Sequence, residues 1–189
     1  MAGLVPAIHV FALEHAKLWM PGTRPGMTRW REMARAQHPI FTIGYEGATV
    51  DGFIGALRKA GVALVLDIRA APVSRKKGFS KNPLAQHLSE AGTGYRHLRG
   101  LGTPKQGREA ARSGDHQSFE RIFRHHLEEP EALLDLGEAL GLAAAKPVCL
   151  LCLERDPQQC HRLIVAERMA KEGDQPIRHL FADVAGDLI

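Results

Sequence analysis

A carboxylate, a thiol, an imidazole and a guanidinium group lie within nine residues of one another, in residues 154–162. Cys160 is a candidate nucleophile or redox thiol, because a helix N-terminus and nearby cations lower the pKa of a thiol. Glu154 is a candidate general acid or base, and Glu46 and Asp67 are candidates for the same role. The alternatives are structural: free cysteines pack well in cores, and acids at strand ends cap turns.

The candidates for binding an anionic substrate are led by arginines, because a guanidinium group matches phosphate with two parallel hydrogen bonds. For these arginines, ion pairing with strand-end acids is the alternative interpretation. For Tyr45, the alternatives are stacking on a base and covering the core. The full set of substrate-binding candidates is Tyr45, Arg69, Ser74, Arg75, Tyr95, His97, His161 and Arg162.

The same stretch offers a metal site as an alternative to thiol chemistry. Cys152, Cys160 and His161 would be its ligands, with Glu154 or His97 as the fourth. However, structural zinc sites usually bring two close pairs of ligands, and this spacing differs from that pattern. We therefore predict no metal and no cofactor, and keep this metal site as the alternative.

A strand-to-helix corner is expected to position these groups. Residues 148–153 are apolar and of strand length, and Asp156 then suits a helix N-cap. Pro157 suits the first helical position, and Gln159 would complete a capping box. This corner would place residues 160–162 in the first turns of the helix, near the carboxyl end of the strand.

Strands and helices alternate along the rest of the chain. This alternation predicts a three-layer α/β domain with a mostly parallel sheet of about five strands, spanning residues 39–189. Residues 99–114 are glycine-rich and basic, and we expect them to form a lid or binding loop. The expected strands are residues 40–44, 62–68, 94–98, 148–153 and 176–181, and the expected helices are residues 49–59, 82–91, 115–127, 130–144 and 157–171.

The predicted strands end in polar residues, and this favours one edge of the sheet as the binding site. In open parallel sheets, ligands bind at the carboxyl ends of the strands, where loops and helix N-termini meet. Two basic segments would supply charge there. Residues 69–81 and 96–112 hold ten of the twelve Lys and Arg residues of residues 39–114, and only one acid. This excess favours an anionic partner, and a solvated basic surface is the alternative interpretation.

The remaining composition limits the class of protein. No run approaches the roughly 18 apolar residues of a membrane helix. Three cysteines form no disulfide framework, so we expect a cytoplasmic protein. Residues 1–38 lack a sustained period and are broken by proline and glycine, so we expect a disordered or mis-annotated extension, with Met33 as a candidate start.

Several of these motifs resemble those of the bacterial and archaeal family known as domain of unknown function 488 (DUF488). The resemblance covers about residues 39–170 and implies a Rossmann-like α/β domain, but it brings no established activity. The matching residues are Thr42-Ile43-Gly44-Tyr45-Glu46-Gly47, Asp67-Ile68-Arg69, Pro72, Ser74-Arg75, Gly78-Phe79, Tyr95, His97, Leu101-Gly102, Leu151-Cys152-Leu153-Glu154 and Cys160-His161-Arg162.

Two functions fit these residues. The first is an enzyme, a hydrolase or a transferase, that acts on a phosphate-bearing substrate, either a nucleotide or a nucleic acid. The second is a non-catalytic module that senses a nucleotide or binds nucleic acid through the basic segments. The first requires carboxylates as well as arginines, with Cys160 as the candidate nucleophile, whereas the second requires the arginines alone. The sequence leaves the substrate, the reaction and the oligomeric state open.

Overall fold

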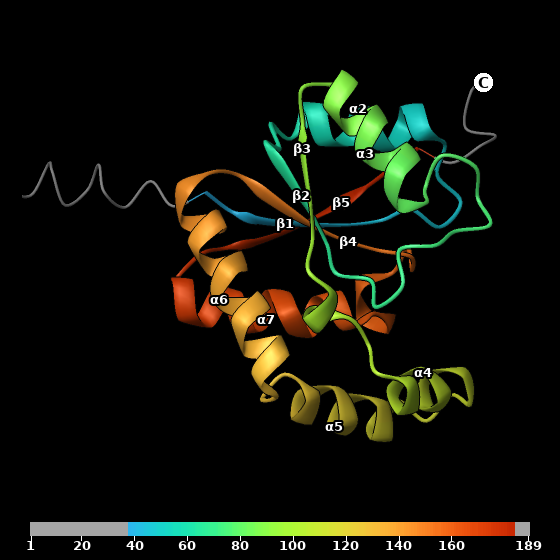
Figure 1. Cartoon of the computed structure of the whole chain (residues 1–189), viewed down its shortest axis with the longest axis vertical. Helices are drawn as coiled ribbons and strands as arrows, with labels where there is room; N and C mark the ends of the chain where they lie inside the picture. The colour runs from blue at the N-terminus through green and yellow to red at the C-terminus, as the bar shows by residue number, and fades with distance from the viewer. Residues whose placement is uncertain (1–37, 184–189) are drawn as a thin grey trace, which may run out of the picture. The chain divides into compact units, whose positions relative to one another are not determined.

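The computed structural model describes residues 38–183, whose strands form one parallel sheet in the order β3-β2-β4-β1-β5 (Figure 1). Strand β4 is central, with β2 and β1 on either side. The predicted parallel sheet and Rossmann-like fold class are confirmed. The bounds are β1 Ile40–Gly44, β2 Leu64–Asp67, β3 Gly94–His97, β4 Val148–Cys152 and β5 Ile177–Phe181.

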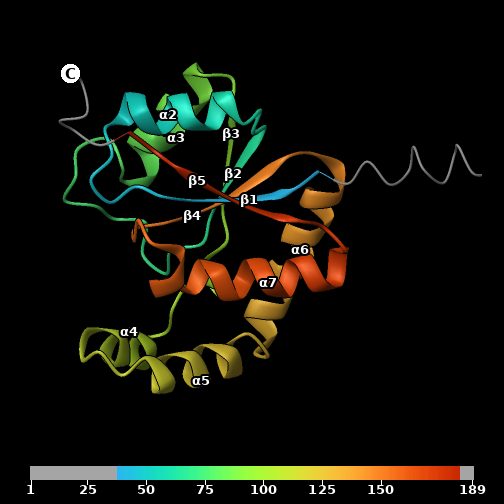
Figure 2. The same cartoon turned by 180° about the vertical axis from the view of Figure 1, so that it is seen from behind.

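Helices cover both faces of this sheet and complete the three layers (Figures 1 and 2). Helices α2 (Val50–Lys59) and α3 (Lys81–Glu90) lie on one face. Helices α6 (Pro130–Ala145) and α7 (His161–Gly173) lie on the other. Thr49 caps α2 as predicted, because its Oγ1 accepts a hydrogen bond from the backbone N–H of Gly52.

A largely aliphatic core fills each layer between sheet and helices. Val65 packs with Phe53 on the α2 side, whereas Leu66 and Leu150 pack with Val165 of α7 on the other side. Every residue of β1, β2 and β4 is buried, as expected for strands covered on both faces. Packing on both faces of the sheet therefore fixes the position of the carboxyl ends of β1, β2 and β4.

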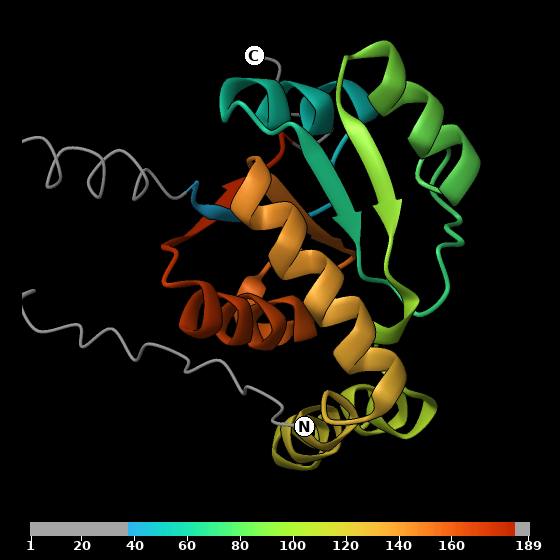
Figure 3. The ribbon, with the colours of Figure 1, turned by 60° about the vertical axis from the view of Figure 1, so that its left-hand side comes forward.

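Residues 99–114 do not form the predicted open loop. They contain a 3₁₀ turn, η1 (Arg99–Leu101), and a helix, α4 (Lys105–Arg112). Helix α4 packs against α5 (His116–His126) on the side of α7 away from the sheet, near the beginning of α6 (Figures 1 and 3). Gly107, which favoured a loop, lies in the helix. A Cβ there would come within 2.9 Å of the Thr103 methyl group, so this glycine permits close packing.

The corner after β4 also differs from the prediction. Pro157–Gln159 form a 3₁₀ turn, η2, and helix α7 begins only at His161. The Asp156 carboxylate accepts a hydrogen bond from the backbone N–H of Gln158 and so caps this short turn. Cys160 is the N-cap of α7, and its sulfur accepts from the backbone N–H of Arg162. Cys160 therefore lies at the helix entrance, where its side chain faces the end of β4.

Within the described part of the chain, each helix is too short or too polar to span a bilayer. Residues 1–37 of the predicted N-terminal extension lie outside the described residues.

Candidate functional site

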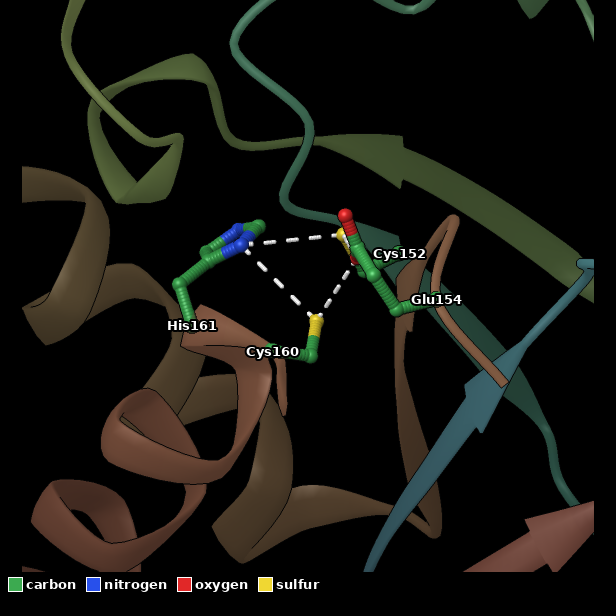
Figure 4. Close-up of side chains that lie close together, drawn as sticks. All are labelled: Cys152, Glu154, Cys160 and His161. Atoms are coloured by element: carbon green, nitrogen blue, oxygen red, sulfur yellow. Dashed lines mark hydrogen bonds between the residues drawn. The ribbon is translucent and has the colours of Figure 1, made fainter. Parts of the chain in front are cut away.

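Four potential metal-ligating side chains meet where β4 ends and α7 begins (Figure 4). Cys152 is the last residue of β4, Glu154 follows it in the turn, and Cys160 and His161 open α7. One sulfur, oxygen or nitrogen atom of each lies within 4.8 Å of the corresponding atoms of the others. We call this group the Cys–Glu–His cluster.

Two features of the chain hold the turn of Glu154 against the sheet. The fully buried guanidinium group of Arg162 donates hydrogen bonds to the backbone carbonyls of Glu154 and Arg155. On the other side, Gly44 permits close approach, because a Cβ there would lie 1.8 Å from the Glu154 carbonyl oxygen. Arg162 was predicted to bind substrate; in the structure, its guanidinium group donates to these two carbonyls and so holds the turn in place.

Hydrogen bonds fix the orientation of the cluster. Glu154 Oε2 accepts from the Cys152 sulfur at 2.9 Å and from the Cys160 sulfur at 3.0 Å. His161 Nε2 lies 3.0 Å from the carbonyl oxygen of Ile68. A carbonyl only accepts, so Nε2 carries the proton and the lone pair of Nδ1 faces the two sulfurs, at 3.6 Å and 3.9 Å.

The protonation equilibria of these groups are linked. Burial alone would raise the pKa of Glu154, but hydrogen bonds from both thiols hold it below its ordinary value. Burial, together with the adjacent Cys152, raises the pKa of Cys160 well above its ordinary value. Burial lowers the pKa of His161, yet the adjacent Cys160 sulfur, the Ile68 carbonyl and the Glu154 carboxylate raise it overall. Without a bound cation, Cys160 is therefore a neutral thiol, contrary to the low pKa expected from the sequence.

A second polar group, the Asp67–Arg69 network, lies at the end of β2 and comprises Asp67, Arg69, Tyr45 and Tyr95. Asp67 is fully buried and pairs with the Arg69 guanidinium through two hydrogen bonds of 2.6 Å and 2.8 Å. The Tyr95 hydroxyl donates to the same carboxylate at 2.6 Å, and Arg69 Nη1 donates to the Tyr45 hydroxyl at 3.2 Å. Burial and Asp67 raise the pKa of Tyr95, so its hydroxyl remains a donor.

The remaining predicted site residues lie outside both groups. His97 Nε2 is 2.9 Å from the Arg69 carbonyl oxygen, so this ring supports the loop after β2. Ser74 exchanges hydrogen bonds with Ser80 inside that loop, and Arg75 is exposed. Glu46 is exposed and accepts from the backbone N–H of Arg155. The structure does not bring Ser74, Arg75 or Glu46 to the Cys–Glu–His cluster.

A cavity of about 400 Å³ connects the two polar groups. A second cavity, of about 450 Å³, shares much of its lining with the first. Both are lined by Arg108 and Arg112, which are four residues apart on α4 and therefore lie on the same face of that helix. The first cavity is lined by Tyr45, Arg69, Ala70, Ala71, Val73, Thr103, Arg108, Arg112, Cys152, Leu153, Glu154 and His161.

Arg108 and Arg112 are the residues that the sequence did not single out. In the sequence, only the basic excess of residues 96–112 pointed to them. Their four-residue spacing places both side chains on one face only in a helix, and no helix was predicted there. In the structure, Arg108 donates to the Thr103 carbonyl at 2.6 Å. Among residues 38–183, Arg112 forms no ion pair, and it lines both cavities. Helix α4 thus adds positive charge to the site.

Comparison with known proteins adds one family. A family model described as "Domain of unknown function DUF488" matches residues 49–169. No curated protein and no solved structure matches the chain.

Proposed function

The chain belongs to the family described as domain of unknown function DUF488, and from that premise we propose that it is an enzyme acting on a phosphate-bearing substrate by hydrolysis or group transfer. The substrate would bind in the 400 Å³ cavity at the carboxyl ends of β2 and β4. A cavity of this size suits a small molecule such as a nucleotide.

One observation carries this proposal: arginines and a half-buried carboxylate line the same cavity. Arg108 and Arg112 face it from α4, and Glu154 and His161 face it from the β4 corner. Hydrolysis and phosphoryl transfer require positive charge at the phosphate oxygens and a group that handles a proton nearby.

The contacts of each arginine indicate how the binding role is divided. Arg69 is buried, and its donors are occupied by Asp67, Tyr45 and the Phe79 carbonyl. We therefore assign phosphate binding to Arg108 and Arg112. Arg69 would act as a positioning residue that keeps the cavity wall in place.

The contacts of the carboxylates divide the catalytic role in the same way. Asp67 is fully buried and paired with Arg69, so it has a positioning role. Glu154 is half-buried and lines the cavity, so it is the carboxylate that a bound water or hydroxyl group can reach. Glu154 is therefore the proposed general base.

The test measures binding and turnover separately. Nucleoside mono-, di- and triphosphates and a short single-stranded oligonucleotide are titrated by calorimetry, and products are followed by phosphorus NMR. We expect an Arg108→Gln/Arg112→Gln variant to weaken nucleotide binding by at least about tenfold, since each lost charged hydrogen bond contributes roughly 1.5–3 kcal/mol. Lys105→Gln is the matched control, because Lys105 is exposed on α4 and lines neither of these two cavities.

Two outcomes contradict the proposal. If both arginines can be replaced without loss of phosphate binding, the cavity is not the phosphate site. If the wild-type chain binds nucleotides or the oligonucleotide but turns over none of them, Glu154→Gln has no reaction to change. The chain is then the non-catalytic binding module instead.

A further inference from the structure

We propose that the Cys–Glu–His cluster is a Zn²⁺ site in which Cys152, Cys160 and His161 are the fixed ligands and Glu154 is the exchangeable fourth. This inference does not depend on the proposed function, since a metal can bind here whatever the substrate. It rests on the donor set, its geometry and its charge.

The donor set matches a borderline-soft divalent cation. Two cysteine sulfurs, one imidazole nitrogen and one carboxylate oxygen are the ligand types that Zn²⁺ binds in proteins. Hard cations such as Mg²⁺ and Ca²⁺ prefer oxygen ligands alone, so two sulfurs argue against them.

Two of the distances between the ligand atoms match those of a tetrahedral site, and all four atoms lie within 4.8 Å of one another. With Zn–ligand bonds of about 2.0–2.3 Å, neighbouring ligand atoms are roughly 3.4–3.8 Å apart. The two sulfur–Nδ1 distances are 3.6 Å and 3.9 Å. The sulfur–Oε2 distances of 2.9 Å and 3.0 Å are shorter, so the Glu154 carboxylate would move outward by roughly 0.5 Å on metal binding. Its half-buried place beside the cavity leaves room for that movement.

The imidazole of His161 is already prepared as a ligand. Metal-binding histidines commonly donate their second N–H to a backbone carbonyl or carboxylate, which fixes the tautomer and increases basicity. The Ile68 carbonyl has this role, because it lies 3.0 Å from Nε2 and leaves Nδ1 directed at the two sulfurs. Phe123 packs edge-on against the ring at 5.1 Å between centroids and restrains its rotation.

The charge of the cluster also accommodates a divalent cation. Among residues 38–183, no Lys or Arg forms an ion pair with the Glu154 carboxylate, whose hydrogen bonds come from thiols, which are weak donors. When Zn²⁺ binds, the two thiols lose their protons to solvent, and the sulfurs become thiolate ligands. Two thiolates and one carboxylate around Zn²⁺ carry a net charge of −1, the same as the metal-free cluster with neutral thiols.

Glu154 is assigned as the exchangeable ligand because of its position. The side chains of Cys152, Cys160 and His161 are 3–5% exposed, whereas Glu154 is the half-buried member of the cluster. Glu154 also lines both cavities, so a molecule bound there could replace it at the metal. Catalytic zinc sites commonly pair three protein ligands with one replaceable position.

The experiment uses the full chain, purified under reducing conditions and freed of metal with a chelator. Zn²⁺ is titrated in competition with a chromophoric chelator, and Co²⁺ is used as a spectroscopic probe. We expect one metal per chain and, with Co²⁺, thiolate-to-metal charge-transfer bands together with the visible bands of a tetrahedral ion. X-ray absorption on the Zn²⁺ form should give two sulfur neighbours near 2.3 Å and two lighter ones near 2.0–2.1 Å.

Near-isosteric variants test the ligand assignment. Cys152→Ser and Cys160→Ser should each weaken Zn²⁺ binding by at least about 100-fold, and Glu154→Gln by about tenfold. Cys149→Ala is the control, because Cys149 is a buried cysteine of β4 outside the cluster, and it should leave affinity unchanged. If a serine variant fails to fold, the Co²⁺ spectrum of the wild-type chain still decides. A wild-type chain without thiolate–Co²⁺ bands, or Zn²⁺ binding that survives loss of both cysteines, overturns the proposal.

Discussion

The Asp67–Arg69 network and the Cys–Glu–His cluster lie along the same edge of the sheet, and each contains a carboxylate, which is fully buried at Asp67 and half-buried at Glu154. Asp67 receives a cation from the chain itself, because Arg69 forms a two-bond ion pair with it. Among residues 38–183, Glu154 receives hydrogen bonds from two thiols and its own backbone N–H, and no ion pair. The Asp67–Arg69 network is therefore electrostatically complete. The Cys–Glu–His cluster is incomplete, and its potential metal-ligating atoms converge on a common point.

This difference distinguishes a group with a structural role from a group that can exchange protons or bind a ligand. The complete network positions the wall of the cavity and offers few unused donors or acceptors. The incomplete cluster can exchange protons or accept a cation without breaking an internal ion pair. Buried charges are costly unless they are paired, so a chain that leaves one carboxylate without an arginine is expected to compensate it in another way.

The largest expected effect comes from removing the cation of the complete network. Arg69→Leu would leave Asp67 buried without its counter-charge, and we expect the free energy of unfolding to fall by about 3–5 kcal/mol. Denaturant unfolding of the full chain measures this change. The double variant Asp67→Asn/Arg69→Leu should recover part of the loss, because it removes the unpaired charge. A loss below about 1 kcal/mol for Arg69→Leu would mean that the pair is not needed to stabilise Asp67.

An intermediate effect is expected where the sheet meets the incomplete cluster. Gly44→Ala would place a Cβ 1.8 Å from the Glu154 carbonyl oxygen, so the turn must shift. We expect a loss of about 1–3 kcal/mol in unfolding free energy and weaker Zn²⁺ binding. Gly55→Ala is the matched control, because a Cβ at Gly55 in α2 meets nothing within 4 Å and alanine favours a helix. Equal stability of the two variants would show that the turn is not held by close contact with β1.

The smallest expected effect comes from the carboxylate of the incomplete cluster. In the metal-free chain, Glu154→Gln should change the unfolding free energy by only about 1 kcal/mol, because no buried cation loses its partner. Glu46→Gln, at an exposed acid that accepts one backbone hydrogen bond, should stay within about 0.5 kcal/mol. A loss for Glu154→Gln as large as that for Arg69→Leu would remove the contrast between the two groups.

Much of the fold could be predicted because local chemistry and hydrophobic pattern agree. The nearly continuous apolar run 62–68 indicates a strand buried on both faces, and the structure has this strand at Leu64–Asp67. Thr49 precedes a helical pattern that it can cap, and it does cap α2. The helix α4 could not be predicted, since Gly107 and Pro104 favour a loop unless their packing is known. As a result, Arg108 and Arg112 were missed as a pair on one helix face.

The site could be predicted only in part, because side-chain direction depends on where a helix begins. A start at Pro157 and a start at His161 differ by about one turn, and only the second makes Cys160 the N-cap. The sequence spacing of Cys152 and Cys160 also does not reveal that a turn folds them together. Nor does sequence distinguish an arginine that binds a ligand from one that, like Arg162, binds backbone carbonyls.

The most direct test of the contrast between the two groups is a count of protons released on metal binding. Calorimetric titration of the reduced, metal-free chain with Zn²⁺ in buffers of different ionisation enthalpy provides this count. We predict one zinc per chain with about two protons released near neutral pH, because two neutral thiols become thiolate ligands. Zinc binding without proton release would contradict the account of two protonated thiols in the metal-free cluster, and no zinc binding at all would contradict the proposal that the Cys–Glu–His cluster holds a cation.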